Sequence, residues 1–184
     1  MVSADEGKFT IQKRGITLDD STAALFLCAE IFDYPTPQAC EDFNTMFAPL
    51  FDCKLEDQDE IESEYIRIFS INSVALQCVP YASWWIDGKM SGASLSKINQ
   101  FYTSCGYEFD LENMKKPADH ISFMIRFAAI LAEEKKKTQL NEFIDFLSWF
   151  EKFVNSLKEV TKVGIFPSAG EITLDIINSL KEEI

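Results

Sequence analysis

The sequence predicts an all-α protein, a single compact helical bundle with no sheet. Apolar residues recur every three or four positions along most of the chain, as on the buried faces of helices, and no segment shows the clear alternation of a half-buried strand. Prolines and glycines divide this pattern into segments of helical length. The 184 residues are 47% hydrophobic, which is enough to fill the core of one domain of this size.

The chain is expected to begin with a flexible polar arm, residues 1–16, and to continue as one helical domain, residues 17–184. The arm lacks the apolar stretch of a secretory signal peptide. The most apolar run, residues 121–132, is too short to span a bilayer. The five cysteines are odd in number and widely spaced, which favours reduced, mostly buried thiols. We therefore expect a cytoplasmic protein.

The first two helices are bounded by prolines. Helical patterning begins near residue 17 and is expected to stop at about Asp33. Thr36 is the predicted N-cap of a second helix, with Pro37 at its first position, that runs to about Phe51.

An acidic segment, residues 55–64, leads into a third predicted helix. It contains six acids and no base. The apolar face of this helix consists of Ile61, Tyr65, Ile68 and Phe69. An acidic run opposite such a face is typical of a solvated helix surface.

Residues 79–92, VPYASWWIDGKMSG, are predicted to form a connector, because Pro80, Gly88 and Gly92 disfavour a helix interior. The segment nevertheless contains three large aromatic residues: Tyr81, Trp84 and Trp85. Rigid aromatic side chains with a polar tip are common on peptide-binding surfaces, although they also cover hydrophobic cores. Because adjacent residues on a helix point about 100° apart, only one tryptophan is expected to face a ligand.

The second half of the chain predicts further helices. Residues 94–105 form a short helix ended by Gly106. Residues 121–132 are apolar on almost every side, which is typical of a buried central helix. Its polar stripe consists of Ser122, Arg126, Ala129 and Glu133.

The C-terminal region is expected to hold two helices. One long helix begins at Thr138 and runs to about residue 160. Ser168 and Glu171 match a capping box, which predicts the start of the last helix.

Composition excludes several classes of function. Thirty acidic and seventeen basic residues give a net charge of −13, which argues against nonspecific binding to nucleic acid or to anionic membranes and permits a basic partner. The glycine-rich phosphate-binding motifs are absent from the sequence. A single histidine and no closely spaced cysteines predict no metal site, and we expect no cofactor.

The most distinctive segment is Lys116-Pro117-Ala118-Asp119-His120, directly before the central helix. It holds the only histidine of the chain beside an acid, and Pro117 fits the first turn of the helix. An enzyme using Ser-His-Asp or Cys-His chemistry would have to use His120, with Asp119 as the acid that orients it. Neighbouring residues in a first helical turn rarely aim at one point, which favours a structural or binding role over catalysis.

Four segments taken in order resemble the TorD/DmsD/NarJ family of redox-enzyme maturation chaperones: EYIRIF (64–69), PYASWWIDGKM (80–90), a helix ending at Gly106, and PADHISFMIRF (117–127). The resemblance covers roughly residues 20–160 and implies an all-helical cytoplasmic protein that is not an enzyme. It further implies binding to the twin-arginine signal peptide, or the equivalent N-terminal segment, of the apo-form of a molybdopterin oxidoreductase subunit. The chaperone would hold this segment until the cofactor is inserted, before export.

The resemblance also implies which residues bind the peptide. They lie in two motifs, Tyr81, Ser83, Trp84 and Gly88 in one, and Pro117, Asp119 and His120 in the other, with Trp85 as a further candidate. From the chemistry of the residues, Asp119 is the first candidate to pair with a peptide arginine, with Glu64 and the acids at 56–62 as an outer field. This chain departs from the family pattern in having Lys116 where an acid is common, and two adjacent tryptophans.

Other hypotheses stay open at this point. They are a small hydrolase or transferase that uses His120, a helical interaction module with an unrelated partner, and guanine nucleotide binding, which some relatives are thought to show. A monomer and a domain-swapped dimer are both compatible with the resemblance. His120 could also make binding sensitive to pH near neutrality, provided that its ring is not buried.

Overall fold

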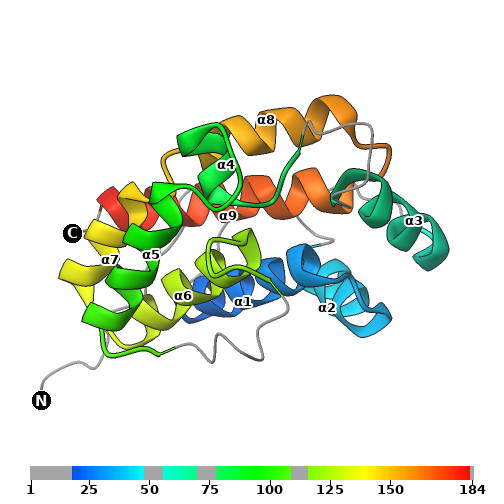
Figure 1. The fold of residues 1–184 in the computed structure, drawn as a ribbon. Helices are drawn as coiled ribbons and strands as arrows, with labels where there is room; N and C mark the ends of the chain where they lie inside the picture. Colours follow the sequence, from blue (N-terminus) through cyan, green and yellow to red (C-terminus); the bar gives the residue numbers. More distant parts are fainter. Residues whose placement is uncertain (1–17, 48–55, 70–77, 109–115, 183–184) are drawn as a thin grey trace, which may run out of the picture.

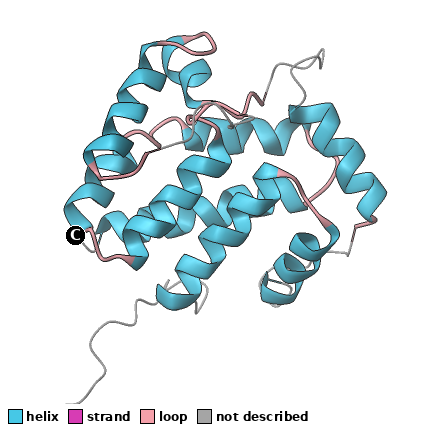
Figure 2. Ribbon diagram, turned by 60° about the horizontal axis from the view of Figure 1, so that its bottom comes forward, coloured by secondary structure: helices cyan, strands magenta, loops and turns pink. Residues whose placement is uncertain are grey.

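The computed structural model describes residues 18–47, 56–69, 78–108 and 116–182, and these ranges contain nine helices and no strand (Figure 1, Figure 2). The helices are α1 (Leu18–Asp33), α2 (Pro37–Phe47), α3 (Gln58–Phe69), α4 (Ala82–Asp87), α5 (Ala93–Ser104), α6 (Ile121–Glu133), α7 (Lys137–Asp145), α8 (Phe150–Val160) and α9 (Ile165–Glu182). The all-α prediction is confirmed. The predicted arm, the end of the second helix and Cys53 lie outside the described residues.

Two helices, α1 and α6, form the centre of the bundle (Figure 1). They pack along each other, and α1 also contacts α2 and α9. The last residue of α1, Asp33, approaches the first turn of α6 at Ser122, so the two helices run antiparallel. At this end of α1, Phe32 is buried against a cluster of rings from α3 and α8: Phe69, Phe150 and Phe153. The core therefore fixes the position of the α1 C-terminus.

Two predicted helix ends, the start of α2 and the end of α5, are confirmed. Thr36 caps α2, because its hydroxyl accepts a hydrogen bond from the amide of Ala39 at 3.2 Å. The helix α5 ends before Gly106, whose φ of 86° is the left-handed conformation that glycine adopts without strain.

The predicted connector at residues 79–92 contains a helix, α4, which the sequence interpretation missed. The helix is six residues long and ends at Gly88, with φ of 70°. The amide of Ser83, in its first turn, donates to the carboxylate of Asp119 at 2.9 Å. Because first-turn amides have no partner inside their own helix, this contact from a distant segment stabilises a helix that local propensity alone does not predict.

The prediction of a single long helix from Thr138 to residue 160 is wrong, because the chain forms two helices there, α7 and α8. Between them, the amides of residues 146–148 and 150 bond to carbonyls three positions earlier, as in a tighter helical turn. The turn carries Trp149, whose ring stacks on that of Trp85 at 6.1 Å. We attribute the break to this tertiary packing, since the segment contains neither glycine nor proline.

The predicted capping box at Ser168 and Glu171 is also wrong, because α9 begins earlier, at Ile165, and Ser168 lies inside it. The amides of Gly164 and Ile165 donate to the carboxylate of Glu56, which thus caps the helix from a remote segment. A proline in the first turn costs no hydrogen bond, and Pro167 is placed accordingly.

The predicted polar stripe of α6 is only partly polar surface. Ser122 and Ala129 are fully buried, Arg126 is half-buried and Glu133 is exposed. The helix is therefore enclosed on more sides than expected, which agrees with its central position.

Candidate functional site

The two motifs singled out in the sequence meet at the start of α6. Tyr81 and His120 form an isolated antiparallel β-bridge, and their rings lie 5.0 Å apart. The amide of Ile121 donates to the carbonyl of Pro80 at 2.9 Å, and the amide of Ala82 donates to the carbonyl of Asp119 at 3.0 Å. We call these two joined segments, residues 80–83 and 116–122, the corner. Backbone hydrogen bonds therefore fix the two motifs to each other.

Asp119 lies inside the corner. Its side chain is buried, and one carboxylate oxygen accepts the amide hydrogen of Ser83. The hydroxyl of Ser83 in turn accepts a hydrogen bond from the amide of Ser91 at 3.1 Å. A carboxylate at the first turn of a helix is also favoured by the helix dipole. The carboxylate of Asp119 thus provides a hydrogen-bond acceptor for the N-terminus of α4.

His120 is the N-cap of α6, and Pro117 therefore precedes the helix instead of occupying its first turn. The imidazole Nδ1 accepts a hydrogen bond from the amide of Ser122 at 3.2 Å and lies 2.8 Å from the hydroxyl of the same residue. An accepting Nδ1 places the proton of a neutral ring on Nε2. The ring is thus used to begin the helix.

Burial decides the charge of His120. The side chain is 2% exposed. Loss of solvation, aided by the positive charge of Lys116, lowers its pKa from 6.5 to about 3. Because the ring is buried, His120 does not make binding sensitive to pH near neutrality. The ring is neutral across physiological pH.

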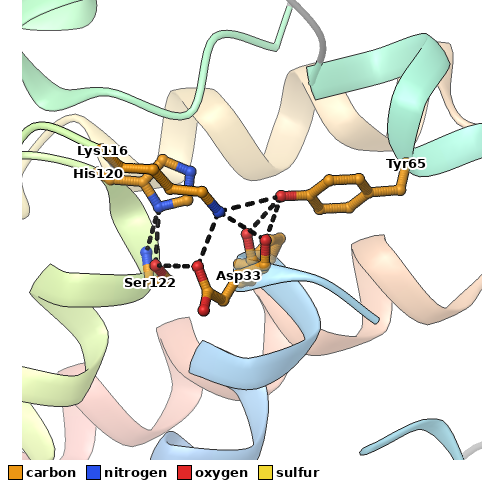
Figure 3. Close-up of polar contacts among 6 residues, drawn as sticks. Asp33, Tyr65, Lys116, His120 and Ser122 are labelled. Atoms are coloured by element: carbon orange, nitrogen blue, oxygen red, sulfur yellow. Dashed lines mark hydrogen bonds and ion pairs between the residues drawn. The ribbon is translucent and has the colours of Figure 1, made fainter. Parts of the chain in front are cut away.

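A polar cluster that the sequence did not predict lies beside the corner (Figure 3). The ammonium group of Lys116 donates to the carboxylate and to the main-chain carbonyl of Asp33, both at 2.7 Å, and lies 3.4 Å from the hydroxyl of Tyr65. That hydroxyl donates to the carbonyl of Asp33. Burial opposes ionisation of Asp33, but the hydrogen bond and charge of Lys116 outweigh it and lower the pKa of the carboxyl. The sequence feature that could have indicated this cluster is Lys116 itself, which stands where the family often has an acid.

The two adjacent tryptophans have different environments. The indole nitrogen of Trp85 donates to the carbonyl of Val79 at 2.7 Å, and its ring packs on Trp149 and Phe153. Trp85 thus covers the hydrophobic core, which is one of the two roles expected for the tryptophans. Trp84 is half-buried.

The loop after α4 is held by a carboxylate. Asp87 accepts hydrogen bonds from the amide and the hydroxyl of Ser94 at 2.9 and 2.8 Å, which caps α5. A Cβ atom at Gly92 would lie 2.2 Å from the Asp87 carboxylate, so this close approach requires glycine. Gly88, at the end of α4, is exposed.

Glu64 is not brought to the corner. It is buried on α3, where Arg67 donates to both of its carboxylate oxygens at 2.6 Å and the amide of Lys162 donates at 2.6 Å. Its carboxylate fastens α3 to the turn between α8 and α9. Of the acidic segment, Glu56, Glu62 and Glu64 therefore accept hydrogen bonds from other parts of the chain.

Within the described ranges, no helix is long and apolar enough to cross a membrane. In the same part of the chain, no group of three or more His, Cys, Asp or Glu side chains is arranged to hold a metal ion. Four cysteines can be placed, and all are free thiols: Cys28, Cys40, Cys78 and Cys105.

Comparisons with known proteins identify the family of the chain. A family model described as nitrate reductase delta subunit matches residues 31–157, a span that includes both motifs of the corner. The chaperone protein TorD of Actinobacillus succinogenes is 25% identical over 96 residues, which are 51% of this chain and 49% of that protein. The match thus spans about half the length of this curated relative.

A solved structure supports the fold. The crystal structure described as a redox enzyme maturation protein from Archaeoglobus fulgidus superimposes with a TM-score of 0.60 at 22% identity, over 83% of this chain and 90% of that one. The chain therefore belongs to the nitrate reductase delta subunit family, the family of the TorD- and NarJ-type redox-enzyme maturation chaperones, which are binding proteins and not enzymes.

Proposed function

We propose that this chain is a cytoplasmic chaperone for the apo-form of a molybdopterin oxidoreductase subunit. It binds the twin-arginine signal peptide of that subunit, or the equivalent N-terminal segment, and holds it during cofactor insertion before export. The observation that carries the proposal is the family match over residues 31–157, because this span contains both motifs that meet at the corner.

The nine candidate residues fall into two groups by exposure. Five are buried, and of these Glu64 lies away from the corner: Glu64, Tyr81, Ser83, Asp119 and His120. The other four are half-buried or exposed: Trp84, Trp85, Gly88 and Pro117. Since Trp85 is committed to the core, we expect Trp84 and Pro117 to provide the contact surface. A twin-arginine peptide has an apolar middle, and each Å² of apolar surface removed from water contributes roughly 25 cal/mol.

The charge of the chain supports a basic partner. At a net charge of −13, the protein attracts a peptide with two arginines over a distance of about one Debye length. This attraction speeds association and is screened by salt, so it predicts a faster encounter at low ionic strength. Orientation must come from specific contacts at the corner.

Calorimetry with a synthetic twin-arginine peptide tests the proposal. The matched control peptide carries two glutamines in place of the arginines. We expect Trp84→Ala to weaken binding by on the order of tenfold, as for a central aromatic residue of an interface. Ile86→Ala is the control variant, because Ile86 is an exposed apolar residue of the same short helix. Equal affinity for the two peptides, or an unchanged affinity in the Trp84 variant, would contradict the proposed site.

Co-purification identifies the client. The oxidoreductase subunit is expressed with and without its N-terminal segment, and only the form that carries the segment should be retained by the chain. Retention of a protein unrelated to molybdopterin enzymes would instead support the hypothesis of an interaction module with a different partner.

A further inference from the structure

The C-terminal end of α1 is built as a receptor for a cation. The last carbonyl groups of a helix have no partner inside the helix and carry the negative end of its dipole. At this end the carbonyl of Asp33 and the carboxylate of the same residue converge on one point, and the hydroxyl of Tyr65 lies beside them (Figure 3). We define the receptor as these three groups.

Lys116 shows which ligand chemistry the receptor accepts. Its ammonium group contacts all three receptor groups, at 2.7, 2.7 and 3.4 Å. The lysine comes from the segment before α6, 83 residues after Asp33 in the chain. The receptor thus already binds a basic side chain that reaches it from a different segment.

The receptor is also accessible. The side chain of Asp33 is 42% exposed and that of Lys116 is 27% exposed, so an incoming group reaches the carboxylate once the lysine swings away. Burial raises the pKa of Tyr65, whose hydroxyl therefore stays protonated and keeps donating to the carbonyl of Asp33. The carbonyl and the hydroxyl of the receptor are therefore held together independently of Lys116, and the hydroxyl of Ser122 lies 3.5 Å from the carboxylate.

We propose that Lys116 is an internal substitute for a basic side chain of the client peptide, which displaces it and binds to the α1 C-terminus. This inference rests on the proposed function and adds to it a subsite for one arginine. A guanidinium group suits the receptor better than an ammonium group, because its planar set of five donors can bond to the carboxylate and the carbonyl together.

The surface next to the receptor fits the residues that follow a basic group in such a peptide. The ring of Tyr34 is 44% exposed, lies 5.3 Å from that of Tyr65, and its hydroxyl donates to Glu62. Ile66 lies one helical turn after Glu62, on the same face of α3, and is 57% exposed. An apolar side chain of the peptide can cover these two residues.

Competition by Lys116 gives the inference a distinct signature. If the lysine occupies the receptor in the free protein, the apparent affinity for an arginine peptide is reduced by the fraction of receptors that are free. A partly exposed ion pair of this kind supports a reduction of about two- to fivefold. Lys116→Met should therefore tighten binding of the twin-arginine peptide by about that factor and leave the twin-glutamine control peptide unchanged.

Asp33→Asn then discriminates between competition and simple charge repulsion. In the wild-type background this substitution weakens the binding of both Lys116 and the peptide arginine to the receptor, so the two effects on peptide affinity partly cancel. In the Lys116→Met background only the peptide is affected, and we expect a loss on the order of tenfold. If Lys116 acted only by repelling the peptide, Asp33→Asn would have the same effect in both backgrounds.

The experiment is isothermal titration of the full chain, the two single variants and the double variant with both synthetic peptides. Lys152→Met, an exposed lysine of α8, is the control for the change in net charge. Lys116→Gln is a second variant for the case that the methionine disturbs folding, and thermal unfolding verifies each protein. Tighter binding in the Lys116 variants and a larger Asp33 effect in their background support the inference.

The outcomes that overturn it are separate from those that overturn the proposed function. If the twin-arginine peptide binds the full chain but Lys116→Met leaves its affinity unchanged, or if the Asp33 effect is equal in both backgrounds, the receptor is not used and the proposed function stands. If no variant prefers the twin-arginine peptide over its glutamine control, both proposals fail.

Discussion

Replacing Asp119 separates its structural role from its proposed role in peptide recognition. The carboxylate accepts the amide hydrogen of Ser83 at 2.9 Å and lies in a site that is 1% exposed. Asp119→Ala removes this acceptor and leaves a buried amide without a partner at the start of α4. Asp119→Asn retains a carbonyl oxygen in the same place and removes only the negative charge.

The magnitude follows from this one hydrogen bond. Leaving a buried donor unsatisfied costs about 1–3 kcal/mol, and a hydrogen bond to a charged group contributes about 1.5–3 kcal/mol. We expect Asp119→Ala to lower the free energy of unfolding by about 2–3 kcal/mol and Asp119→Asn by about 1 kcal/mol or less. For a domain of this size, each kcal/mol corresponds to a fall in Tm of about 2–4 °C.

Urea unfolding followed by circular dichroism measures both variants, and calorimetry with the twin-arginine peptide measures binding. If the carboxylate pairs with a peptide arginine, Asp119→Asn loses affinity while it stays folded. If the residue only holds α4 in place, the asparagine variant binds as the wild type does. An alanine variant within about 0.5 kcal/mol of the wild type would refute the reasoning from the Ser83 contact.

Three further predictions concern stability. Hydrogen bonding to Arg67 lowers the pKa of Glu64 below its ordinary value of 4.5. The ionised Glu64 carboxylate therefore stabilises the fold fully above pH 4.5, and this stabilisation is lost as the pH falls through the lowered pKa. Glu64→Gln should therefore cost about 1–3 kcal/mol in urea unfolding at neutral pH and less in acid. The pKa of His120 is lowered to about 3, so only the unfolded state gains a proton as the pH falls below 6.5, and the folded state loses stability there. His120→Asn, which keeps an acceptor at the N-cap, should show a smaller fall in stability between neutral pH and about pH 5, and an equal fall would contradict the assignment. Gly92→Ala should lower the Tm by an amount equivalent to about 1–3 kcal/mol, because its Cβ would clash with Asp87; a Tm equal to that of the wild type would contradict this.

The sequence predicts those helix boundaries that are set locally. Pro37 with its cap Thr36, and Gly106 at the end of α5, restrict the backbone regardless of what lies around them, and their effects appear where expected. The errors occur where a distant group decides. The start of α9 depends on Glu56, more than a hundred residues earlier, and the break before α8 carries Trp149, which packs on Trp85.

The candidate site shows the same division. The resemblance identified the two motifs, and the backbone contacts between residues 80–83 and 119–121 bring them together. It could not give the orientation of Asp119, because the partner of its carboxylate is an amide of a helix that the sequence did not predict. Nor could it find the receptor for Lys116, since Asp33 was visible only as the last residue of a helix.

The hydrogen bond between Ser83 and Asp119 makes the attachment of the two motifs of the corner measurable. An amide in the first turn of an isolated six-residue helix exchanges its hydrogen with water rapidly, because nothing in the helix protects it. In this fold the amide of Ser83 is protected only while Asp119 is docked against it. Its exchange rate in deuterated water therefore reports the free energy of separating the two motifs, and a change in that rate on adding a peptide would show whether the ligand tightens the corner or loosens it.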